Sequence, residues 1–138
     1  MKNLLFFSIV LILSLAACTY NSVGDKSTAP VNKVDTGLRI GGPKYEINPF
    51  LHVAFDSVLN DSRCPENADC IWVGNAALRF IFTNKEESIK FVLNTDLPPR
   101  DTVIEGYRVK LLKLTPPLRV NVFLKQSDYR AEISAEKE

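Results

Sequence analysis

The chain has 138 residues, of which 46% are hydrophobic and 24% charged. This composition is that of a globular protein and excludes a disordered chain, and the length suits a single domain. The 17 Lys and Arg residues are balanced by 16 Asp and Glu residues. Because nucleic-acid binding needs an excess of basic side chains on one face, we expect no nucleic-acid partner.

An apolar segment follows the short basic start of the chain. Residues 4–17 are apolar except for two serines. As a helix they would span about 21 Å, less than the ~30 Å hydrocarbon core of a bilayer. The pattern therefore favours a cleaved export signal over residues 1–17 rather than a membrane-spanning helix.

The end of this segment, Leu15-Ala16-Ala17-Cys18, resembles the lipobox of bacterial lipoproteins. The resemblance implies a diacylglyceryl thioether on the Cys18 sulfur, cleavage before Cys18 and, in many bacteria, acylation of the new amino terminus. Several acyl chains would hold a small domain on a membrane. The alternatives are an ordinary signal peptide with a chance cysteine and an uncleaved anchor.

Sorting to a particular membrane depends on the residues after the cysteine. Thr19 stands where an Asp would resemble an inner-membrane retention signal, and no acidic cluster follows in residues 20–24. We therefore expect an outer-membrane lipoprotein that faces the periplasm. Residues 18–36 are polar and contain Gly24 and Pro30, which predicts a lipidated N-terminus and a flexible tether spanning about 21–25 Å.

Short segments of alternating apolar residues, separated by Gly and Pro, fill the rest of the chain and predict β-strands. The expected strands cover residues 38–40, 51–56, 76–83, 89–93, 103–104, 107–112 and 129–133. Residues 120–124 fit either an edge strand or an extended loop. The prediction is an all-β domain over residues 37–134, a small antiparallel β-sandwich or barrel of about 6–8 short strands, followed by a charged tail at 135–138.

Cys64 and Cys70 remain as a pair once Cys18 carries lipid. Export places them where disulfides form and persist, and closing so short a loop contributes roughly 2–2.5 kcal/mol in the chain-entropy treatment. Zinc ligation is the alternative, but two thiolates and one histidine do not complete a tetrahedral set. We predict one disulfide, Cys64–Cys70.

The stretch from Asp61 to Ala76, Asp-Ser-Arg-Cys-Pro, four residues, then Cys-Ile-Trp-Val-Gly-Asn-Ala, resembles a signature of small exported or lipid-anchored bacterial proteins of unknown function. The resemblance extends to Leu-Thr-Pro-Pro at residues 114–117 and to Tyr129 and Ala131. It covers most of the domain and implies an all-β fold in the cell envelope, without implying an activity.

The residues of this stretch also have a structural interpretation. Asp61 or Ser62 would accept backbone amides in a turn, and Arg63 would pair with Asp61, Glu66 or Asp69. Trp72 would cover the disulfide as a core aromatic, and Gly74 would supply a bulge or a positive φ. Alternatively, the loop presents a binding surface, for which the candidate residues are Asp61, Arg63, Pro65, Glu66, Asp69 and Trp72.

Residues able to support catalysis or to bind a metal are sparse. His52 is the only histidine, and we expect it on the solvent face of a strand rather than as a catalytic base. Four carboxylates, Asp56, Asp61, Glu66 and Asp69, offer oxygen ligands for Ca²⁺, but their spacing matches no EF-hand and ordinary turn acids are the favoured interpretation. We predict no catalytic residues, no metal and no cofactor.

These features together predict a non-enzymatic binding module of the periplasm. Its expected partners are the membrane, through the lipid anchor, and another envelope protein. The alternative is a small inhibitor of an envelope hydrolase, such as a lysozyme or a protease, with residues 65–69 as the loop that enters the cleft.

Overall fold

The computed structural model describes residues 37–138. The predicted signal peptide, the lipidation of Cys18 and the tether therefore lie outside the described residues. Within the described part the chain forms eight strands and one short 3-10 helix, and no helix there is long and apolar enough to cross a membrane. The elements are β1 (Leu38–Arg39), β2 (Tyr45–Asn48), β3 (Leu51–Asp61), β4 (Ala76–Thr83), β5 (Ser88–Asn94), β6 (Asp101–Ile104), β7 (Tyr107–Thr115), η1 (Gln126–Asp128) and β8 (Arg130–Lys137).

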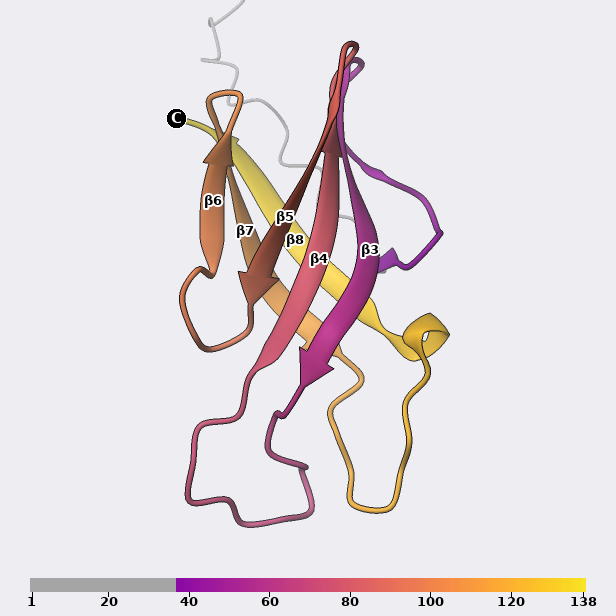
Figure 1. The fold of residues 1–138 in the computed structure, drawn as a ribbon, viewed down its shortest axis with the longest axis vertical. Coiled ribbons are helices and arrows are strands. Elements are labelled where there is room, and N and C mark those ends of the chain that lie inside the picture. Colours follow the sequence, from indigo (N-terminus) through magenta and orange to yellow (C-terminus); the bar gives the residue numbers. More distant parts are fainter. Residues whose placement is uncertain (1–36) are drawn as a thin grey trace, which may run out of the picture.

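The strands form two four-stranded antiparallel sheets (Figure 1). One sheet has the order β1-β8-β7-β6 and the other the order β2-β3-β4-β5. The sheets face each other and are not joined into a closed barrel, so the predicted all-β fold is confirmed in its sandwich form.

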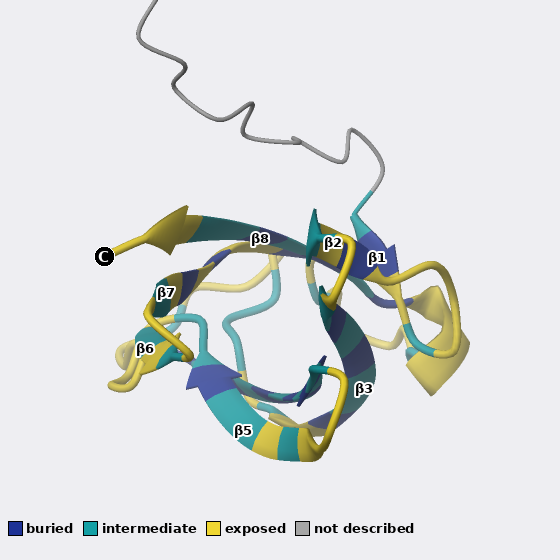
Figure 2. Cartoon of the chain, turned by 90° about the horizontal axis from the view of Figure 1, so that it is seen from above, coloured by how far each residue is buried: buried dark blue, intermediate teal, exposed yellow. Residues whose placement is uncertain are grey.

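The core lies between the two sheets, where the buried residues of the strands face each other (Figure 2). In β4 every second residue, namely Ala76, Leu78, Phe80 and Phe82, is fully buried, as the alternation of side chains along a strand requires. Three rings stack across the sheet, with centroids 5.3 Å apart for Phe55 and Phe80 and 5.6 Å apart for Phe80 and Phe91. A continuous apolar layer thus fixes the register of β3, β4 and β5.

Several strand limits differ from those expected. Strand β2 was not expected from the sequence. Strand β3 extends through Asp61, because its pairing with β4 continues beyond register shifts after Phe55 and Val58. Strand β8 continues through Lys137, into the residues expected to form a tail, because Tyr107 pairs with Lys137. Residues 120–124 contain no strand and lie in the loop between β7 and η1.

Candidate functional site

Two loops extend beyond the strands at the same end of the molecule, opposite the C-terminus (Figure 1). Loop A is residues 62–75 and joins β3 to β4; loop B is residues 116–125 and joins β7 to η1. We call the two loops together the tip. Loop A contains the disulfide stretch singled out in the sequence except its two ends, Asp61 and Ala76, which belong to β3 and β4.

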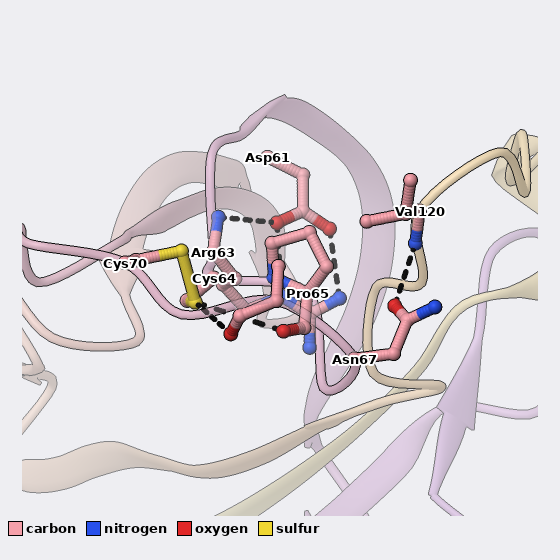
Figure 3. Close-up of a disulfide and its surroundings, with 8 residues drawn as sticks. Asp61, Arg63, Cys64, Pro65, Asn67, Cys70 and Val120 are labelled. Carbon is pink, nitrogen blue, oxygen red and sulfur yellow. Dashed lines mark hydrogen bonds and ion pairs between the residues drawn. A yellow bond between two sulfur atoms is a disulfide. The ribbon is translucent and has the colours of Figure 1, made fainter.

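The disulfide between Cys64 and Cys70 is present, with the two Cα atoms 6.0 Å apart (Figure 3). It closes a small ring within loop A, in which the Ala68 amide donates to the Pro65 carbonyl at 3.1 Å. Pro65 is half-buried, whereas Glu66 and Asp69 are exposed. The bond therefore constrains loop A locally.

Arg63 joins the base of loop A to both sheets. Its guanidinium donates two hydrogen bonds to Asp61, at 2.9 and 2.7 Å, and one each to the carbonyls of Leu114 and Pro116, both at 2.9 Å. The Tyr129 hydroxyl donates to the same carboxylate at 3.1 Å. Since the Arg63 and Asp61 side chains are only 14% and 6% exposed, this is a largely buried, fully hydrogen-bonded pair.

This arrangement brings together residues that lie far apart in the sequence. Asp61 ends β3, Leu114 lies near the end of β7, and Tyr129 precedes β8, yet all three contact Arg63 or its partner. Burial, and next the Asp61 carboxylate, raise the pKa of Tyr129 to about 12. Of the partners expected for Arg63, the structure selects Asp61.

Gly74 is required by close approach and not by a positive φ, so the expected reason for this glycine was wrong. A Cβ atom at this position would lie 2.4 Å from the Arg63 Cα and the Ser62 carbonyl oxygen and 2.5 Å from the Cys64 amide nitrogen. The two limbs of loop A are held together here, because the Ser62 amide donates to the Asn75 carbonyl at 2.7 Å. No side chain fits between them.

Asn75 connects loop A to the segment between β5 and β6. Its side-chain nitrogen donates to Asn94 Oδ1 at 2.9 Å, and its side-chain oxygen accepts from the amides of Asp96 and Leu97 at 3.1 and 3.3 Å. This role was not predicted, because an Asn in a loop gives no indication of a partner about twenty residues later.

Loop B is bonded directly to loop A. The Glu66 amide donates to the Leu118 carbonyl at 2.9 Å, and Arg119 pairs with Glu66 at 3.3 Å. The Val120 amide donates to Asn67 Oδ1 at 2.8 Å (Figure 3). At the far end of loop B, Gln126 exchanges two hydrogen bonds with the backbone of Val58 in β3. Both ends of loop B are therefore fastened.

Large apolar side chains of the tip face the solvent. Ile71 is 97% exposed, Trp72 63% and Phe123 97%, and Val73, Val120 and Val122 are also exposed. The expectation that Trp72 covers the disulfide as a core aromatic is therefore wrong: the core is already filled by Phe55, Phe80 and Phe82. The tip presents Trp72 instead of burying it.

The remaining candidates do not come together. His52 is half-buried and pairs with Thr83, at the end of β3 away from the tip, and its Nδ1 atom lacks a hydrogen-bond partner. Asp56 is bonded to Arg79 at 2.6 Å, which lowers the pKa of its carboxyl. Asp61 and Glu66 have arginine partners. Within residues 37–138, no group of three or more His, Cys, Asp or Glu side chains is placed to hold a metal ion.

Comparisons of the chain with protein-family models, with curated proteins and with solved structures yield no match.

Proposed function

We propose that this protein is a lipid-anchored, non-enzymatic binding module of the bacterial cell envelope, carried on the outer membrane and facing the periplasm. The observation that carries the proposal is the tip: two loops bonded to each other present six exposed apolar side chains at one end of a sandwich. Contiguous apolar patches on a monomer usually mark an interaction site, and in this proposal the exposed side chains of the two bonded loops serve together as one.

The polar groups of the tip support binding over chemistry. Asp61 and Arg63 are engaged with each other and with backbone carbonyls, and Glu66 pairs with Arg119. A general acid or base must reach its substrate, and a nucleophile needs an oriented base. The tip residues that do reach outward, Ile71, Trp72 and Phe123, offer contact area without chemical reactivity.

Crosslinking at the tip tests the proposal. A photoreactive amino acid is placed at Ile71 or Phe123 in the full chain in cells, and at Glu86 in the β4–β5 turn as a control at the opposite end. We expect adducts, with protein or with lipid, to be enriched at the two tip positions. Equal labelling at all three positions would refute a binding role for the tip.

The lipid anchor has a separate test. Cys18→Ser should abolish labelling by a radioactive fatty acid and cause unprocessed precursor to accumulate. A serine variant that is still labelled and processed would refute the anchor without affecting the crosslinking result.

A second candidate function is inhibition of an envelope hydrolase such as a lysozyme or a protease. The observation that favours it is the ring of residues 65–69, closed by the disulfide and bonded to loop B. The purified, detergent-solubilised protein is added to such hydrolases at increasing concentrations. Unchanged hydrolysis rates would exclude this function.

A further inference from the structure

The exposed apolar residues of the tip form two separate runs on two loops. Residues 71–73 lie on loop A, and Val120, Val122 and Phe123 lie on loop B. Both loops extend from the same end of the sandwich (Figure 1). A single surface that covers both runs must therefore receive two projections at once.

A bilayer interface receives such projections without a matching pocket. A protein partner would need a concave site complementary to both loops, whereas lipid headgroups and the adjoining acyl chains rearrange around inserted side chains. Trp72 also has the chemistry of the membrane–water interface, where an indole places its ring in the apolar layer and its N–H in water. Its neighbour Ile71 adds an aliphatic side chain with almost no protein contact.

The charges of the tip agree with shallow insertion into a phospholipid interface. Loops A and B together carry three basic residues, Arg63, Arg119 and Lys125, and two acidic residues, Glu66 and Asp69. Both arginines, Arg63 and Arg119, are already ion-paired. The contact therefore does not depend on anionic lipid, and the hydrated backbone of the loops stays at headgroup depth because unpaired peptide groups do not enter hydrocarbon.

The proposed anchor is close enough for the tip to reach the same membrane. The 18 residues between Cys18 and Gly37 have a maximum extension of about 60 Å. The 11-residue strand β3, which runs the length of the sandwich, spans about 36 Å. The chain is therefore long enough to pass the sandwich and let the tip face the bilayer.

On these grounds we propose that the tip docks into the interface of a phospholipid bilayer through Ile71, Trp72 and Phe123. This inference rests on the proposed function and names the envelope component that the tip contacts. The lipid anchor and the tip would then be two attachments to one surface, and two weak attachments act together to hold a protein firmly.

The single tryptophan makes the test specific, because all tryptophan fluorescence of the chain comes from Trp72. The full chain is reconstituted into phosphatidylcholine vesicles with or without bromine on the acyl chains. We expect bromine to quench Trp72 and its emission to be blue-shifted. Val122→Ser with Phe123→Ser on the other loop should reduce the quenching, whereas Val103→Ser, an exposed apolar residue of β6, should not.

Two results would overturn the inference. If Trp72 is not quenched by bromine but is fully accessible to iodide in the water, the tip is free of lipid, and the wider proposal of a binding module still stands. If Trp72 is protected from both bromine and iodide, a protein surface covers it. A change at Val103→Ser equal to that of the loop B variant would also contradict docking through the tip.

Discussion

Arg63 is the residue on which the tip depends most, because its guanidinium bonds to the end of β3 and to two carbonyls at the end of β7. A buried charge pair contributes little to stability compared with apolar packing. The loss of one partner is nevertheless strongly destabilising, because it leaves the other charge buried and unpaired. Arg63→Ala would leave the buried Asp61 carboxylate without an opposite charge.

We expect Arg63→Ala to lower the free energy of unfolding by about 3–5 kcal/mol, measured by urea denaturation with the disulfide intact. Arg119→Ala is the matched control, because its pair with Glu66 is exposed and should contribute less than about 1 kcal/mol. Equal losses in the two variants would contradict the structural role of Arg63.

Gly74→Ala tests the close approach between the limbs of loop A. The added Cβ would meet backbone atoms at 2.4 Å, so we expect a loss on the order of 3 kcal/mol in unfolding free energy. Gly41→Ala is the control: Gly41 has φ of +69° but nothing within 4 Å of an added Cβ, and should lose about 1 kcal/mol. A smaller loss at Gly74 than at Gly41 would refute the explanation.

Tyr129 should make stability depend on pH in the alkaline range. Its pKa rises from 10.0 in the unfolded chain to about 12 in the folded protein, so the folded state retains the proton longer. The stabilisation is fully present below pH 10 and is lost as pH rises through 12, by on the order of 2–3 kcal/mol. Denaturation at stepped pH should show this loss in the wild type but not in Tyr129→Phe; the same slope in both would contradict the assignment.

At the scale of elements, loop A has two independent constraints, the disulfide ring and the Arg63 hydrogen bonds. Replacing both cysteines with serine should therefore lower the unfolding free energy by about 2 kcal/mol while the strands remain, since the ring is short. Far-UV circular dichroism and urea denaturation would measure the two parts of this prediction. Loss of the strand signal in water would show that the ring organises the sandwich.

The alternating strands and the cysteine pair could be predicted from the sequence because both are governed by local rules. Alternating apolar residues in the sequence identify β4 and β5 directly. Cys64 and Cys70 lie six residues apart in the sequence, so each has its partner close by along the chain. The structure matches these predictions because each depends on neighbours along the chain or directly across a hairpin.

The tip could not be predicted in the same way. An aromatic residue next to a disulfide is apolar whether it is buried or exposed, so the sequence predicts a core position for Trp72 that the structure contradicts. Whether Val120 and Val122 belong to a strand depends on a free sheet edge, and here loop A provides hydrogen bonds instead. Gly74 is explained only by the position of residues 62–64, which no local pattern reveals.

At the scale of the whole molecule, the core and the tip are separable. The core residues lie between the sheets, whereas Ile71, Trp72 and Val73 project into solvent. Their replacement should therefore affect binding and not folding.

We expect the triple change Ile71→Ser, Trp72→Ser and Val73→Ser to shift the unfolding free energy by less than about 1 kcal/mol, because surface substitutions remove few contacts. Far-UV circular dichroism during urea denaturation measures the unfolding free energy of this variant, which has lost the tryptophan needed for fluorescence. The core change Phe80→Ala is the comparison and should lose about 3–5 kcal/mol. A loss of that size in the triple variant would mean that the loop A side chains are part of the core.

The short strand β1 has a mechanical consequence for an anchored protein. It runs antiparallel to β8 through only two residue pairs, with its N-terminal end directed away from the tip. Suppose that the tip is held at one surface and the chain before Gly37 is pulled away from that surface. The load then runs along β1, so the two residue pairs between β1 and β8 carry it together rather than breaking in turn. The buried side chain of Leu38 also holds β1 to the core, so it would pass force on the proposed anchor into the sandwich.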